Sequence, residues 1–395
     1  MKAPQTSISL KELFWNFFLI GSYAFGGHMA LVAMVRKQLV DKRKVLTDDQ
    51  ILDGVSLASI LPGPLAVNSV VYYGFILSGV KGAMVSFFGV LLPTVVLVAT
   101  FSVYYFSTGE QADFHIAFII PVVAAVIASV GFNMAKKQMR LVSQGCIAII
   151  AFMVAITAPN VLFLIGSIFL GGVVGYFIYG KEEPVVNSNP GVAKPLNKTE
   201  LKTLVVIEAS IVALMLLLSF FTGVLSTSLS LASVFSGMSL TLFGGGYVII
   251  PIMEQALVSD LHWVTLQEFN AAIGISQVTP GPILSSVTFI GYKMGGITGA
   301  IIATLSIFLP SSLLMILLSH VQQKIKHLTY IDAVMKGVRS VVIGLIFSGA
   351  YIIGLKHFGF NILPWAIFSI SLLLFLFTKI HPALIILLTL LFSFI

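Results

Sequence analysis

Long apolar stretches alternate with short polar loops along the whole chain. Most of these stretches are unbroken and are long enough to cross about 30 Å of hydrocarbon as a helix. We expect such crossings at 82–107, 114–134, 141–158, 160–180, 204–222, 295–320, 331–355, 360–377 and 380–395. The pattern therefore predicts a helical protein that crosses a membrane many times.

Four further apolar stretches carry a helix-breaking motif near the middle. FGG interrupts 12–43 and 230–256, and PGP interrupts 51–80 and 267–293. Proline removes a backbone donor and glycine tolerates unusual dihedral angles, so both motifs stop a helix. Each arm beside PGP has only about 11–15 residues, too few to cross alone. Each stretch is either one broken crossing or a re-entrant hairpin with the motif at its tip.

The charges of the loops distinguish these two possibilities. Loop 36–50 carries five Lys or Arg residues, whereas its later counterpart, 254–268, carries none. Loop 108–113 is acidic, whereas 320–327 contains Lys324 and Lys326. Positively charged loops stay on the cytoplasmic side, so the two halves of the chain should have opposite orientations. Treating all four broken stretches as hairpins satisfies these charges and gives nine crossings.

The two halves also repeat each other in sequence. FGG and PGP lie 37 positions apart in both halves, and 73–93 aligns with 290–310. Two similar halves in opposite orientations form an inverted repeat, an architecture typical of alternating-access carriers. We expect an all-α polytopic membrane protein whose halves each have two re-entrant helical hairpins and about four transmembrane helices. The expected parts are a first repeat at 1–180, a polar linker with an extra crossing helix at 181–227, and an inverted repeat at 228–395.

Composition supports this class and excludes others. Of the 395 residues, 58% are hydrophobic and 9% are charged, whereas about a quarter are charged in soluble domains. The net charge of +7 comes from Lys and Arg in short loops, which favours membrane orientation over nucleic-acid binding. The single cysteine, Cys146, cannot form a disulfide within the chain. We expect no metal and no cofactor.

Several motifs together resemble those of one transporter family. They are FGGGYVIIPIMEQALV, the W-x-T at 263–265, ISQVTPGPILSSVTFIGYKMGG and GAIIATLSIFLP. This combination is similar to the chromate ion transporter family in its long, two-half form, across nearly the whole chain. The resemblance implies an inner-membrane carrier of chromate, and of sulfate as a related dianion, that works in efflux. The first half departs from the pattern, with FGGHM and with Arg36 where the second half has Glu254.

The repeated motifs predict an anion site. A doubly charged oxyanion in a bilayer needs donors and positive potential, which helix N-termini supply without a buried Lys or Arg. Irregular backbone at that depth is tolerated where it lines a cavity. The alternative is that the motifs are only packing kinks. The expected substrate-binding residues are Phe25, Gly26, Gly27, Ser59, Pro62, Gly63, Pro64, Asn68, Gly244, Gly245, Gly246, Gln277, Thr279, Pro280, Gly281, Pro282 and Ser285.

Three charged residues inside apolar stretches are candidates for coupling or gating, because such residues are costly in a membrane. Asp53 and Glu254 could carry a coupling proton, and Arg339 could draw anions toward the site. Each could instead lie at the membrane surface.

The sequence also bears on other classes of function. The sequence shows no nucleophile elbow, metal-protease motif or nucleotide-binding loop, so we expect no enzyme and transport driven by an ion gradient. An anion channel, or a carrier of sulfate or another oxyanion, remains an alternative. The small-residue stretch 171–180 could pack helices within one chain or between two copies in a homodimer.

Overall fold

The computed structural model describes the chain with several gaps, and its described residues are helical, with no strand among them. The described ranges are 8–24, 27–108, 110–180, 225–243, 246–319, 329–359, 361–378 and 380–393. The expected linker, the expected crossing at 204–222, Lys324 and Lys326 lie outside them. The chain divides into two compact units, and each unit combines segments from both halves of the sequence.

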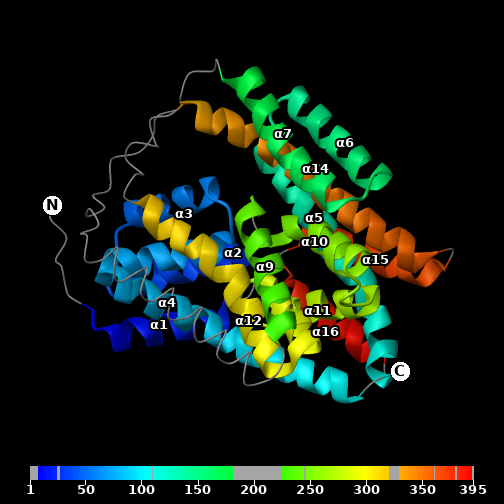
Figure 1. Ribbon diagram of the computed structural model, residues 1–395, viewed down its shortest axis with the longest axis horizontal. Helices are drawn as coiled ribbons and strands as arrows, with labels where there is room; N and C mark the ends of the chain where they lie inside the picture. The colour runs from blue at the N-terminus through cyan, green and yellow to red at the C-terminus, as the bar shows by residue number, and fades with distance from the viewer. Residues whose placement is uncertain are drawn as a thin grey trace. The chain divides into compact units, whose positions relative to one another are not determined.

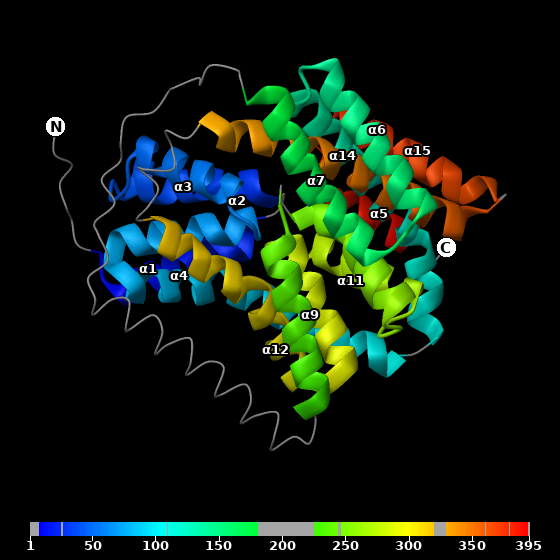
Figure 2. The ribbon, with the colours of Figure 1, turned by 45° about the horizontal axis from the view of Figure 1, so that its top comes forward.

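Unit 1 comprises residues 1–103, 186–245 and 279–327. Its helices, in chain order, are α1 (Leu10–Tyr23), α2 (Gly27–Val35), the π-helix η1 (Arg36–Lys42), α3 (Asp48–Ile60), most of α4 (Leu65–Thr108), α9 (Leu225–Thr241), the short 3₁₀ turn η4 (Ile283–Ser285) and α12 (Ser286–Ser319). Helices α9 and α12 lie side by side, as Figures 1 and 2 show.

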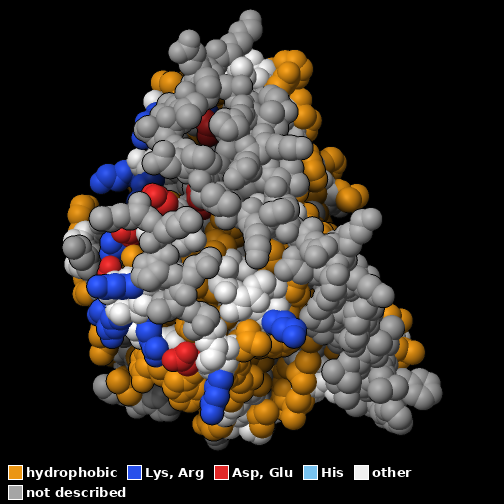
Figure 3. All heavy atoms as spheres, turned by 90° about the vertical axis from the view of Figure 1, so that its left-hand side faces the viewer, with side chains coloured by type: hydrophobic (Ala, Val, Ile, Leu, Met, Phe, Trp, Pro, Cys, Tyr) orange, Lys and Arg blue, Asp and Glu red, His pale blue; other side chains and the backbone are white. Residues whose placement is uncertain are grey.

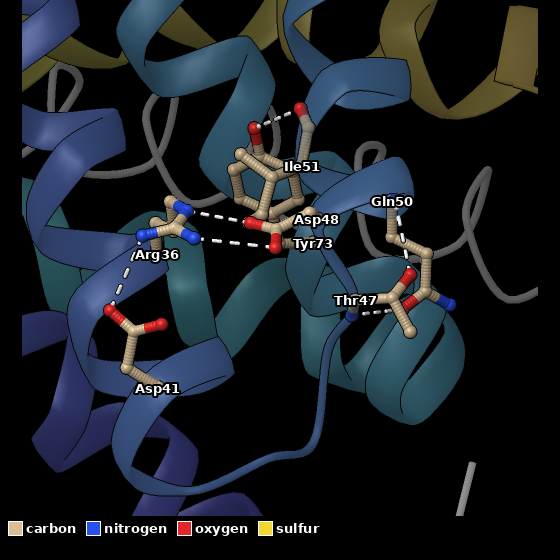
Figure 4. Close-up of polar contacts among 7 residues, drawn as sticks. All are labelled: Arg36, Asp41, Thr47, Asp48, Gln50, Ile51 and Tyr73. Atoms are coloured by element: carbon tan, nitrogen blue, oxygen red, sulfur yellow. Dashed lines mark hydrogen bonds and ion pairs between the residues drawn. The ribbon is translucent and has the colours of Figure 1, made fainter. Parts of the chain in front are cut away.

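Helix α3 and the start of α4 fold back on each other around PGP at 62–64. The Tyr73 hydroxyl donates to the carbonyl of Ile51 at 2.9 Å (Figure 4), and a side chain at Gly54 would overlap the rings of Tyr72 and Tyr73. Residues at similar distances from the tip along the two arms therefore face each other. The two arms lie side by side, whereas a broken crossing would place them end to end.

A second pair of repeated breaks ends each of these stretches. Helix α4 is kinked at Ser78–Gly79 and α12 at Gly295–Gly296, with φ of +62° at Gly79 and +59° at Gly296. These positive φ angles favour glycine. The kinks fall within two residues of the expected boundaries between hairpin and crossing at 80–82 and 293–295. Each long helix therefore changes direction where the sequence separates two elements.

Glycines let the chain approach itself closely on either side of each kink. A side chain at Gly82 would overlap the carbonyl of Gly74, and one at Gly299 would overlap the carbonyl of Gly291. The two glycine pairs are equivalent in the repeat, so the two halves share this backbone contact.

Unit 2 comprises residues 104–185, 246–278 and 328–395. Its helices are α5 (Glu110–Gln138), α6 (Val142–Thr157), α7 (Val161–Tyr179), the 3₁₀ turn η2 (Gly246–Val248), α10 (Ile249–Glu254), the π-helix η3 (Gln255–Asp260), α11 (Leu266–Val278), α14 (Thr329–Phe358), α15 (Ile362–Phe377) and α16 (Pro382–Phe392).

The two halves exchange partners within unit 2. Helix α14 of the second half packs on α6 and α7 of the first, and α5 of the first half packs on α15 and α16 of the second. Figures 1 and 2 both show α14 lying along α6 and α7. Neither half of the sequence therefore completes this unit alone.

The small residues of 171–180 face α14 of the same chain. A side chain at Gly175 would overlap the backbone of Ala333 and Gly337, and one at Gly171 would overlap Val341. We expected this stretch to pack helices either within one chain or between two copies, and the structure shows packing within the chain.

The helices are suited to lipid contact. Five described helical segments are long and apolar enough to cross a membrane, and three shorter apolar helices accompany them. In α7, the side chains of Leu162, Phe163 and Phe177 are exposed. Figure 3 shows basic and acidic side chains gathered beside exposed hydrophobic ones on one face. The sequence-based prediction of an all-helical membrane protein is confirmed; the re-entrant placement of the hairpins stays a prediction.

Candidate functional site

The first PGP tip, in unit 1, lies against the second half of the chain. Gly63 has a φ of +112°, and its N–H donates to the carbonyl of Leu242 at 2.6 Å. A side chain at Gly63 would overlap Ser311 of α12 and approach the Asn68 amide. Only glycine fits here, because both the dihedral angle and the space exclude a Cβ atom.

The second PGP tip, also in unit 1, lies against the first half. Gly281 has a φ of +116°, and its N–H donates to the carbonyl of Ala24 at 3.1 Å. The Thr94 hydroxyl of α4 donates to the carbonyl of Pro280 at 2.5 Å, and a side chain at Gly281 would overlap Thr94.

These two tip contacts are reciprocal. Ala24 and Leu242 directly precede the two FGG motifs, so each PGP tip meets the chain just before the FGG of the other half. Thr94 and Ser311 each follow the repeated proline of a long helix. Each PGP tip is thus held by the residue that precedes the FGG of the other half, so both contacts join the two halves.

The contacts also limit which donors an anion could use. In this arrangement the N–H groups of Gly63 and Gly281 are already donated to carbonyl oxygens. Donors near the tips would therefore come from other groups at the starts of α4 and α12, either side chains or the first backbone N–H groups of each helix.

Polar side chains follow the first tip at the start of α4. Asn68 is fully buried; its amide donates to the carbonyl of Pro62 at 3.2 Å, and its oxygen accepts from the hydroxyls of Ser311 at 3.3 Å and Ser312 at 3.4 Å. Pro62 is half-buried and Pro64 is buried. In α3, Ser59 is half-buried and donates to the carbonyl of Ser56. Asn68 is therefore the residue that fastens the first tip to α12.

Around the second tip, Thr279, Pro280 and Pro282 are buried in unit 1. Ser285 is fully buried in η4, directly before α12. Gln277 belongs to unit 2, where its amide exchanges hydrogen bonds of 3.1 and 3.2 Å with the Tyr247 hydroxyl.

Of the expected FGG residues, Phe25, Gly26, Gly244 and Gly245 lie outside the described residues. Gly27 begins α2 and Gly246 begins η2, so both motifs do interrupt helices.

The candidate coupling residues are placed on three different helices. Asp53 is 5% exposed in α3 of unit 1. Glu254 is 3% exposed at the end of α10, directly before a π-helix, and Arg339 is half-buried in α14; both belong to unit 2. Both carboxylates are therefore enclosed in protein, whereas a residue at a wet hairpin base would be exposed.

Arg36, the counterpart of Glu254, lies at the surface. Its guanidinium contacts Asp48 at 2.6 Å and Asp41 at 3.4 Å, as Figure 4 shows, and about half of each side chain is exposed. The hydrogen bond to Asp48 and the two nearby negative charges raise the pKa of Arg36 above its ordinary value. This turn is thus a solvated cluster of charges, unlike the buried surroundings of Glu254.

Sequence reasoning missed Thr94, Ser311, Ser312 and Tyr247 as neighbours of the expected site. For two of them a pattern was present, since Thr94 and Ser311 are polar residues directly after the prolines at 93 and 310 in otherwise apolar stretches. Within the described residues, no three His, Cys, Asp or Glu side chains come together as a metal site requires.

Comparison with known proteins identifies relatives over most of the chain. A chromate transport protein of Cupriavidus metallidurans is 27% identical over 88% of this chain and 83% of its own length. An uncharacterized transporter of Methanocaldococcus jannaschii is 28% identical over 98% of this chain and 94% of its own length. The uncharacterized transporter YwrA of Bacillus subtilis is 29% identical over 36% of this chain and 81% of its own length.

No solved structure is significantly similar to the chain. The family model for chromate transporters matches it twice, over residues 11–176 and 229–394, so that both halves are covered. The chain therefore belongs to the chromate transporter family.

Proposed function

We propose that the protein is a secondary active transporter that exports chromate across the cytoplasmic membrane by alternating access, with the anion bound at the PGP tips. Family membership supports the substrate, and the related dianion sulfate is the alternative cargo. The reciprocal docking of the tips at Gly63 and Gly281 is the observation that carries the proposal. It puts the irregular backbone of both PGP tips next to a segment from the other half of the sequence.

We further propose that the four broken stretches are re-entrant hairpins and that the two halves are inverted. The side-by-side packing of α3 and α4 favours a hairpin over a broken crossing. Inverted halves explain why the tip contacts are reciprocal, because an inverted repeat relates its halves by a pseudo-two-fold axis.

Protons are the proposed coupling ion, with Asp53 and Glu254 as carriers. Both carboxylates are buried, and buried ionisable residues in membrane proteins commonly lie on ion pathways. Arg339, half-buried in α14, is proposed to attract the anion toward the site.

The test is uptake of labelled chromate and sulfate into proteoliposomes, with and without a pH gradient. Gly63→Ala and Gly281→Ala are each expected to lower uptake at least tenfold, because a Cβ atom cannot be placed at either tip. Gly237→Ala is the matched control, since a side chain there would contact nothing within 4 Å.

Uptake that survives both tip substitutions would contradict the proposed site. Electrical currents far above the turnover of a carrier would instead indicate a channel. If a proton gradient drives uptake, Asp53→Asn or Glu254→Gln should remove the dependence on that gradient and leave anion exchange in place.

A further inference from the structure

The two PGP tips differ in the polar side chains that follow them, although their backbones match. Around the kinks the halves align with an offset of 217 residues, so Asn68 and Ser69 of the first half correspond to Ser285 and Ser286 of the second. All four side chains are at most 1% exposed. The comparison is therefore between buried groups at equivalent positions of the repeat, in the first turns of α4 and at the junction of η4 with α12.

In the first half these polar groups are satisfied by the protein. Asn68 is bonded to the carbonyl of Pro62 and to two hydroxyls of α12, and Ser69 donates to the carbonyl of Leu65 at 2.8 Å. The first tip is closed by its own hydrogen bonds.

In the second half the corresponding hydroxyls are not satisfied. The side-chain oxygens of Ser285 and Ser286 are buried, and neither has a hydrogen-bond partner among the residues that the structure describes. The carbonyl of Pro280, which corresponds to that of Pro62, accepts from Thr94 of the other half instead. A buried hydroxyl without a partner lowers stability, and two adjacent ones at one helix start require an explanation.

Single buried serines without a partner also occur within α4 and α9, at Ser86, Ser228 and Ser239. The pair at Ser285 and Ser286 differs from these because it occupies the N-terminus of a helix. The positive end of the helix dipole there favours an anion and disfavours a cation. Neutral hydroxyl donors also bind a dianion without holding it irreversibly.

We infer that the anion site is asymmetric: the oxyanion binds at the start of α12 through the Ser285 and Ser286 hydroxyls, while the first tip serves as a structural clasp through Asn68. This inference rests on the proposed function and makes it specific to one of the two tips. The ligand class is a tetrahedral oxyanion, for which chromate and sulfate are the probes.

The test measures equilibrium binding of labelled chromate and labelled sulfate to the purified full-length protein, together with its unfolding temperature. The double variant Ser285→Ala/Ser286→Ala is expected to weaken binding at least tenfold. Its unfolding temperature without anion should be unchanged or higher, because it removes hydroxyls that have no partner. A purely structural role for the two serines predicts the opposite shift.

Ser69→Ala is the matched control in the first half, and its binding should stay within about twofold of the unmodified protein. Ser285→Asn is a second probe: an amide like that of Asn68 should fill the second tip and abolish binding in protein that remains folded.

The outcomes separate this inference from the proposed function. If Gly281→Ala abolishes transport while Ser285→Ala/Ser286→Ala binds both anions normally, the tip site stands and the asymmetric site is wrong. If the unmodified protein binds neither anion, both proposals are wrong. Equal loss from Ser69→Ala and from the double variant would also overturn the asymmetry.

Discussion

The turns at 36–47 and 254–265 have the same backbone but opposite electrostatic character. Both contain a π-helix, both place a non-glycine residue at positive φ (+54° at Lys44, +53° at His262), and both end in a capping box. Yet the first turn is exposed and rich in Lys and Arg, whereas the second carries neither and begins at the buried Glu254. The repeat therefore conserves backbone geometry and leaves charge free to differ between the halves.

The largest expected effect comes from exchanging the charges at the corresponding positions 36 and 254. Glu254→Arg should cost about 3–5 kcal/mol of stability, because it places an unmatched positive charge where the side chain is 3% exposed. Arg36→Glu should have a much smaller effect on stability, because the ion pairs of Arg36 are half exposed to solvent. Chemical denaturation of the purified protein measures both values, with Glu254→Gln as the neutral control. Equal costs would show that the two turns do not differ in burial.

An intermediate effect on stability is expected at the capping box, a feature that both turns share. Thr47 accepts from the N–H of Gln50 at 3.3 Å and Thr265 from that of Glu268 at 3.2 Å, each at a helix start. Thr47→Ala and Thr265→Ala should therefore each cost about 1 kcal/mol, whereas Thr→Ser at either position should be nearly neutral. Denaturant midpoints of the four variants test this expectation. A loss of stability on Thr→Ala in only one half would show that the two capping boxes are not equivalent.

The smallest effect concerns an ion pair that only the first half has. Arg43 contacts Glu12 at 3.1 Å, and the corresponding second-half residues are Leu261 and Ser230. Hydrogen bonds from Ser9 and then from Arg43 lower the pKa of Glu12 below its ordinary value of 4.5. A lowered carboxylate pKa adds stability above the ordinary pKa, and this stability is lost as the pH falls through the lowered one.

Arg43→Gln should therefore lower the unfolding temperature slightly at neutral pH. The difference from the unmodified protein should disappear in acid once Glu12 is protonated. Melting curves at a series of pH values measure the difference, and one that persists unchanged in strong acid would show that the ion pair is not its cause.

Much of the fold follows from local sequence patterns. Apolar length predicts the helices, and Gly and Pro predict the breaks at 62–64 and 280–282, because these effects act within a few residues. The kinks at Ser78–Gly79 and Gly295–Gly296 also fall near predicted boundaries. The exchange of α5 and α14 between the halves was not predictable, because it depends on which apolar faces meet in three dimensions.

The candidate site shows the same limit. The sequence marks PGP, but it does not show that Gly63 binds Leu242 or that Thr94 binds Pro280, since these residues are 179 and 186 positions apart. It also does not show that Asn68 is satisfied while Ser285 is not. Hydrogen-bond partners of this kind depend on packing, so two copies of one motif can have different partners.

Reciprocal docking of the tips also fixes an order of events during synthesis. At a synthesis rate of about 5–20 residues per second, Leu242 is made roughly 10–40 s after Gly63. The N–H of Gly63 therefore lacks this acceptor during that time. During that interval the first half remains in the membrane with an unfinished tip. Carrying both halves on one polypeptide turns this delayed encounter into an intramolecular one and so raises the effective concentration of each half for the other.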